Sequence, residues 1–181
     1  YFYFNLVRQY GDVPFTDHFL SADESNTLSR TPAKDIFDYI ISECDEIKDS
    51  IIEDYANLPA DVVLPSESPE TGRVNKATVL ALKARAALYA ASPLFNTDNN
   101  PELWHRAATA NKELLDYCVN ERGMKLVSDY ASLWDKNNYK NATDELILVV
   151  VRIVSPVQWS RIIILPELKV EMEETVRHKT W

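Results

Sequence analysis

The chain has 181 residues, of which 46% are hydrophobic and 26% are charged, and its net charge is −9. This length and composition are typical of a globular domain with its own hydrophobic core. The negative charge argues against nucleic acid and against an anionic membrane surface as partners, because both bind basic patches. No stretch approaches the roughly 20 apolar residues that a membrane-spanning helix needs.

The first segment, residues 1–9, is rich in aromatic and aliphatic side chains and predicts the end of a buried helix. Gly11 and Pro14 follow it in the order that is usual after a helix C-terminus. Residues 15–30 are mostly polar and predict a loop. The chain opens in mid-element and without a starting methionine, so we expect the N-terminal targeting segment to lie upstream of Tyr1.

Thr31 and Pro32 predict the start of a second helix, with Thr31 as the N-cap and Pro32 in the first turn. Charged residues, Asp45 and Glu46 among them, fall largely on the opposite side and are interpreted as a solvated face. The apolar residues recur at helical spacing and predict the buried face: Ile36, Ile40, Cys44, Ile47 and Ile51.

Residues 76–91 predict a third helix that is apolar almost all round, which is typical of a buried helix. Asn75 is its expected N-cap, and Pro93 ends it because the residue before a proline disfavours helical geometry. Small side chains recur at spacings of three and four and let neighbouring helices pack closely: Ala77, Ala81, Ala84, Ala87 and Ala91.

A fourth helix is expected to begin at Asn100 and Pro101 and to end before Gly123. Trp104 and Leu115 lie beside its apolar stripe and are interpreted as packing residues. The stripe itself is Leu103, Ala107, Ala110 and Leu114.

After this helix the pattern is less regular. Residues 145–154 predict a strand, and residues 167–177 a short helix. Cys44 and Cys118 each fall in an apolar stripe and are interpreted as buried thiols. The fold class expected is therefore mainly α, built of helix pairs with a minor β element, as in helical-repeat proteins.

Four segments, in this order and spacing, resemble the SusD/RagB family of outer-membrane nutrient-binding lipoproteins. The resemblance covers residues 1–151, whereas residues 152–181 form a tail without a family signature. Since family members are several times longer, we expect this chain to be an internal portion. The segments are residues 2–14 ending in Tyr-Gly-Asp-Val-Pro, Arg30-Thr31-Pro32, residues 72–96, and Trp104 with Ala107 and Ala108 followed by Tyr130, Leu133 and residues 145–147.

The resemblance implies tetratricopeptide-like helix pairs that support long loops. It implies a protein held by a lipid anchor, attached upstream of this chain, on the cell-surface face of the outer membrane. Such proteins bind an oligosaccharide or another nutrient and deliver it to a TonB-dependent, SusC-like transporter. They carry out no reaction, and no cofactor or metal is expected.

Trp134, Asn138 and Tyr139 are the candidate ligand-binding residues, because sugars bind to aromatic faces flanked by hydrogen-bonding groups. The alternative interpretation is that these side chains pack on the scaffold and do not contact a ligand.

Catalytic and metal-binding patterns are absent from the sequence. The three histidines are isolated, and there is neither a nucleophile elbow nor a phosphate-binding glycine loop. Two other functions stay open. One is a helical-repeat module that binds a peptide or protein. The other is a glycan-active α-helical enzyme with two converging carboxylates.

Overall fold

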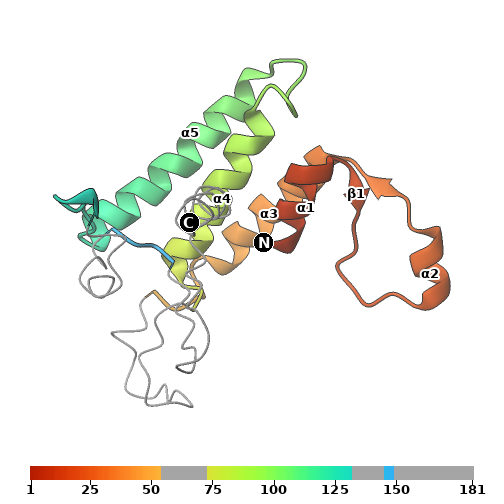
Figure 1. Ribbon diagram of the computed structural model, residues 1–181, viewed down its shortest axis with the longest axis horizontal. Helices are drawn as coiled ribbons and strands as arrows, with labels where there is room; N and C mark the ends of the chain where they lie inside the picture. Colours follow the sequence, from red (N-terminus) through yellow and green to blue (C-terminus); the bar gives the residue numbers. More distant parts are fainter. Residues whose placement is uncertain (54–72, 132–144, 149–181) are drawn as a thin grey trace, which may run out of the picture. The chain divides into compact units, whose positions relative to one another are not determined.

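The computed structural model describes residues 1–53, 73–131 and 145–148. The chain divides into two compact units, residues 1–51 with 76–125, and residues 52–75 with 126–181, and each is described by itself. The first unit contains the helices and strands labelled in Figure 1 and confirms a mainly α fold with a minor β element. None of the helices in the described ranges is long and apolar enough to cross a membrane.

Helix α1 (Phe2–Tyr10) ends where the sequence predicts. Gly11 takes a left-handed φ of 70°, and its N–H donates to the carbonyl of Val7 at 2.9 Å. Residues with a side chain beyond Cβ adopt such a φ rarely, so glycine fits this position. Phe4 and Val7 are buried, which confirms that α1 turns an apolar face to the core.

Two short strands follow, β1 (Val13–Pro14) and β2 (Arg30–Thr31), which pair antiparallel with Val13 opposite Thr31. They enclose residues 15–29, which we call the excursion. The prediction of a featureless loop here is wrong, because the excursion contains helix α2 (Ala22–Thr27). The pattern Ser21-x-x-Glu24, a capping box, is the sequence signal that marks its start.

Helix α3 (Ala33–Ile47) begins differently from the prediction. Thr31 is not its N-cap, since it pairs with β1, and Pro32 occupies the cap position without a side-chain hydrogen bond. The N–H of Ala33, in the first turn of the helix, instead donates to Oδ1 of Asp12 at 2.7 Å. A residue distant in sequence thus supplies the capping oxygen, which local pattern reasoning does not detect.

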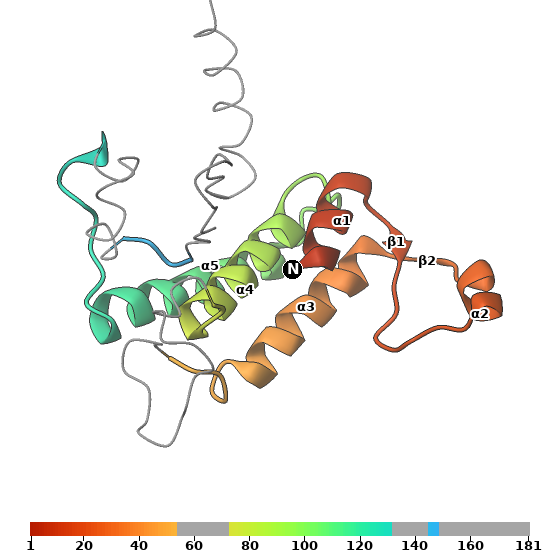
Figure 2. The same ribbon diagram turned by 60° about the horizontal axis from the view of Figure 1, so that its bottom comes forward.

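The core forms where α4 (Lys76–Ala91) packs against both α3 and α5 (Pro101–Asp116). Figures 1 and 2 show α4 beside α5, with α3 on its other side. Of the alanines predicted to allow close packing, Ala81 is half-buried and the other four are buried: Ala77, Ala84, Ala87 and Ala91. Aromatic rings fill the end of the core nearest α1. There the ring centres of Phe37 and Phe95 lie 5.0 Å apart, and those of Phe4 and Tyr89 lie 5.3 Å apart.

The predicted apolar faces are wider than the observed ones. Ile47 is exposed at the end of α3. On α5, Ala107 and Ala110 are buried, but Trp104 and Leu115 are 42% and 61% exposed, so their interpretation as packing residues is wrong. These two lie on a second stripe of the helix, turned away from the stripe that contacts α4.

The end of α5 continues into η1 (Tyr117–Glu121), a π-helical turn that buries Tyr117 and Cys118. Cys44 on α3 is buried too, and both thiols are free, as predicted. Burial raises the pKa of Cys44 to about 11 and also raises the pKa of Cys118. Both cysteines are therefore protonated and unreactive at neutral pH.

In the second unit the N–H of Val127 donates to Oε2 of Glu145 at 2.8 Å. Residues 145–148 form a turn and a bend, so the strand predicted over residues 145–154 is wrong for its described part. The rest of that strand, the helix predicted over residues 167–177 and the expected boundary after residue 151 lie outside the described residues.

Candidate functional site

The three candidate ligand residues, Trp134, Asn138 and Tyr139, lie outside the described residues. Their role stays a prediction. The polar and aromatic groups that the structure does describe fall into an ion cluster, a pocket beside it, and a set of exposed rings.

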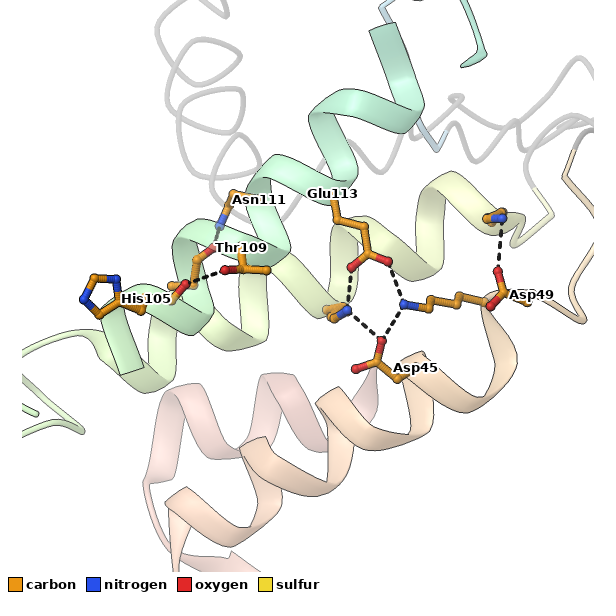
Figure 3. A network of polar contacts seen from close by, with 10 residues as sticks. Asp45, Asp49, His105, Thr109, Asn111 and Glu113 are labelled. Atoms are coloured by element: carbon orange, nitrogen blue, oxygen red, sulfur yellow. Dashed lines mark hydrogen bonds and ion pairs between the residues drawn. The ribbon is translucent and has the colours of Figure 1, made fainter. Parts of the chain in front are cut away.

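The ion cluster ties together α3, α4 and α5 (Figure 3). Lys83 of α4 places its Nζ 2.6 Å from Oδ1 of Asp45 and 2.6 Å from Oε2 of Glu113. Lys48 of α3 contacts the same two carboxylates, at 2.8 Å and 2.6 Å. Asp45 is exposed, as the interpretation of a solvated face predicts, but its pairing with two lysines was not predicted, because the sequence does not show which helices face one another.

The cluster is electrically balanced, with two lysines and two carboxylates. Burial raises the pKa of Asp45 and of Glu113, but hydrogen bonds from Lys48 and Lys83 outweigh it, and both pKa values lie below the ordinary ones. The hydrogen bonds that Lys48 donates to Asp45 and Glu113 raise its own pKa. A general acid or base works best with a pKa near the working pH. Asp45, Lys48 and Glu113 are shifted away from neutrality and serve to join helices.

A second polar contact joins α3 to α5. Arg106 pairs through Nη1 with Asp38, which also accepts from Lys34 at 2.8 Å. Asp38 in α3 pairs with Arg106, and Lys48 directly after α3 pairs with Glu113. The partners on α5 therefore occur in the same order along the chain. The two helices therefore run parallel on either side of α4, the arrangement of alternate helices in stacked helix pairs.

An open pocket of about 450 Å³ adjoins the ion cluster. Lys76 lies within it, 3.2 Å from Asp49 and 5.3 Å from the centre of the Tyr117 ring. The remaining lining residues are Leu80, Thr109, Lys112, Glu113, Asp116 and Glu121.

The histidines form no metal site within the part of the chain that the structure describes. No group of three or more His, Cys, Asp or Glu side chains there is placed to hold a metal ion. His18 contacts Asp17 at 2.8 Å on the surface, and His105 lies on α5.

Several aromatic rings of the first unit are exposed, and sequence reasoning identified none of them as surface groups. Phe19, in the excursion, is 103% exposed. Phe2 and Tyr10 on α1 and Trp104 on α5 are exposed as well. A regular helical pattern does not show which of two apolar stripes is covered, so these positions depend on the tertiary structure.

No known family model matches the sequence, and no curated protein matches it. Among solved structures, a SusD-like protein from Bacteroides fragilis NCTC 9343 matches with a TM-score of 0.59 and 24% identity, over 86% of this chain and 25% of that chain. Surface glycan-binding protein A from Bacteroides uniformis matches with a TM-score of 0.58 and 22% identity, over 83% of this chain and 28% of that chain.

The chain has the SusD-like fold. It corresponds to 25% and 28% of the lengths of these two proteins. At such identities the likeness establishes the SusD-like fold alone, because one fold supports different functions through different surface groups.

Proposed function

We propose that this chain is the helical scaffold of a cell-surface protein that binds glycans without cleaving them. The observation that carries the proposal is the match to two SusD-like folds over 86% and 83% of the chain, one of them in a protein named for glycan binding. In the intact protein a lipid anchor holds this scaffold on the outer face of the outer membrane. The bound oligosaccharide passes to a SusC-like TonB-dependent transporter.

The electrostatics of the ion cluster argue against its carboxylates as a glycosidase pair. A glycosidase needs two carboxyl groups facing a cleft, one of them with a raised pKa so that it can donate a proton. Asp45 and Glu113, the carboxylates that come together from α3 and α5, have lowered pKa values and are held by lysines on both sides. They are unsuited to that chemistry.

Trp134, Asn138 and Tyr139 are proposed to contact the sugar. Indole and phenol rings offer flat apolar faces to the C–H groups of a pyranose, and an amide hydrogen-bonds its hydroxyls. Their spacing in one polar segment, Trp134 to Tyr139, is consistent with a single binding surface.

A panel of polysaccharides tests the proposal. The intact protein is titrated with each by calorimetry, and the same mixtures are analysed for products. Binding to one class without cleavage is the expected result, and cleavage would overturn it in favour of an enzyme. Trp134→Ala should weaken binding at least tenfold without lowering the melting temperature. Trp104→Ala, which removes an exposed tryptophan from α5, is the matched control and should bind normally.

A peptide- or protein-binding module is the second candidate, and one observation favours it. The outer stripe of α5 and η1 presents Trp104, Leu115 and Val119, all exposed, at helical spacing. Exposed apolar stripes of this kind bind other proteins. Failure to bind any glycan, combined with binding of peptides that Leu115→Asp abolishes, would favour this module.

A further inference from the structure

The excursion, residues 15–29, is fixed at its root. The pairing of β1 with β2 closes its two ends. The hydroxyl of Tyr3 donates to the carbonyl of Thr16 and accepts from the N–H of the same residue, both at 3.0 Å. Phe15 packs between the rings of Tyr3 and Tyr39, each 4.7 Å away. Surface loops of roughly 6–16 residues with closed ends are frequently functional.

The far end of the excursion is ordered although it is exposed. Figures 1 and 2 show α2 there, apart from the other helices of its unit. None of the residues of α2 is buried, so packing does not hold it in shape. Its reciprocal capping box does: Ser21 N–H donates to Glu24 at 2.9 Å, and Glu24 N–H donates to the Ser21 hydroxyl at 3.3 Å.

Phe19 lies just before α2, and the Thr16 hydroxyl holds the adjacent backbone by donating to the carbonyl of His18 at 2.7 Å and accepting from its N–H at 3.2 Å. At 103%, Phe19 has the largest exposed fraction of the large hydrophobic residues that the structure describes. Fixing the backbone around an exposed phenylalanine costs conformational entropy and leaves the ring in water. Binding to a partner would offset these two costs by removing the ring from water. Aromatic side chains are accordingly enriched at the buried centres of protein interfaces.

The charges around Phe19 select among partners. The excursion contains Asp17, Asp23 and Glu24 but no lysine or arginine. A partner that covers it needs basic groups around an apolar pocket. Nucleic acids, anionic lipids and a second copy of this chain, whose net charge is −9, are all repelled. A neutral glycan gains nothing from the excess of negative charge.

We propose that the excursion is a docking element for a protein that presents an apolar pocket with a rim of lysine or arginine. Phe19 enters the pocket, while Asp23 and Glu24 attract the rim during encounter. The proposal rests on the function proposed above, in which the protein partner is the outer-membrane transporter.

The test uses the full-length protein purified from its own outer membrane in mild detergent. Copurification of a TonB-dependent transporter is measured by mass spectrometry, and glycan binding is measured in parallel. Phe19→Ala should reduce the recovered transporter at least tenfold and leave glycan affinity unchanged. Phe2→Ala is the matched control, because it removes an exposed phenylalanine from α1, and should recover the transporter normally.

A second variant tests the charges. In Asp23→Asn/Glu24→Gln, glutamine preserves the hydrogen bonds of the capping box, so α2 keeps its shape. We expect the association rate to fall severalfold at low salt and to lose much of its dependence on ionic strength.

Three results would overturn the proposal: Phe19→Ala retains the transporter, Phe19→Ala loses the glycan instead, or the unaltered protein recovers no transporter. Glycan binding by the unaltered protein is scored separately. Its loss would count against the proposed glycan binding, whereas retained glycan binding without a transporter would count against the docking proposal and against delivery to a transporter.

Discussion

The helices α3, α4 and α5 and the excursion use the same kinds of side chain in opposite ways. Phe37 of α3 is fully buried against other rings, whereas Phe19 of the excursion is fully exposed. Lys83 lies buried between two carboxylates, whereas Asp23 and Glu24 lie on a surface segment that contains no lysine or arginine. In the helices these groups contribute stability. In the excursion the same kinds of side chain are exposed and accessible to another molecule. Burial, and not residue type, therefore distinguishes the two regions.

Inserting a larger side chain into the helical core should lower the stability most. Ala84→Trp inserts an indole where α4 contacts its neighbours and should lower the free energy of unfolding by about 3 kcal/mol. Chemical denaturation followed by circular dichroism measures it. Leu88→Trp places the same residue on the exposed side of α4 and should change stability little. Equal stability of the two variants would contradict the assignment of the buried face.

Breaking the ion cluster should have the next largest effect. Lys83→Met leaves Asp45 and Glu113 to share one lysine and should cost about 2 kcal/mol, less than for a fully buried pair because Asp45 is 42% exposed. A double-mutant cycle with Glu113→Gln measures the coupling. Lys34→Met removes an exposed lysine from Asp38 and should lower the stability far less. A cost as small for Lys83→Met would show that the cluster does not join the helices.

Acid should weaken the ion pairs that join the helices. Asp38, Asp45 and Glu113 have lowered pKa values in the folded state, so the unfolded chain binds more protons as the pH falls. Their stabilisation is complete above the unfolded pKa of about 4 and is lost below it. The free energy of unfolding should therefore be level from pH 7 to about 5 and then fall. Asp45→Asn/Glu113→Gln should flatten this slope, and an unchanged slope would assign the acid sensitivity to other groups.

The excursion should tolerate loss of its cap. Ser21→Ala removes one side of the capping box, which should fray α2 but change the global free energy of unfolding by less than about 0.5 kcal/mol, since no residue of α2 is buried. Amide hydrogen exchange should accelerate in residues 22–27 alone. A fall in the global melting temperature would mean that α2 packs on the core.

Sequence reasoning succeeds where a signal is local. The ends of α1 and α4 follow from Gly11 and Pro93, and the burial of α4 follows from its alanines. It fails where a group acts across the fold. Asp12, which precedes β1, accepts the hydrogen bond that caps α3, and Asp45 of α3 pairs with Lys83 of α4. The candidate ligand residues beginning at Trp134 were read from composition alone and stay a prediction.

The sequence by itself determined that the chain is mainly helical, which helices are apolar, and that the net charge is negative. These properties follow from periodicity, capping and composition, which act over a few neighbouring residues. Only the tertiary structure decided which apolar stripe of α5 is covered, which charges neutralise one another, and that Phe19 stands in solvent on an ordered segment. The reason is that burial depends on contacts between residues distant in sequence, and a pattern along the chain does not contain them.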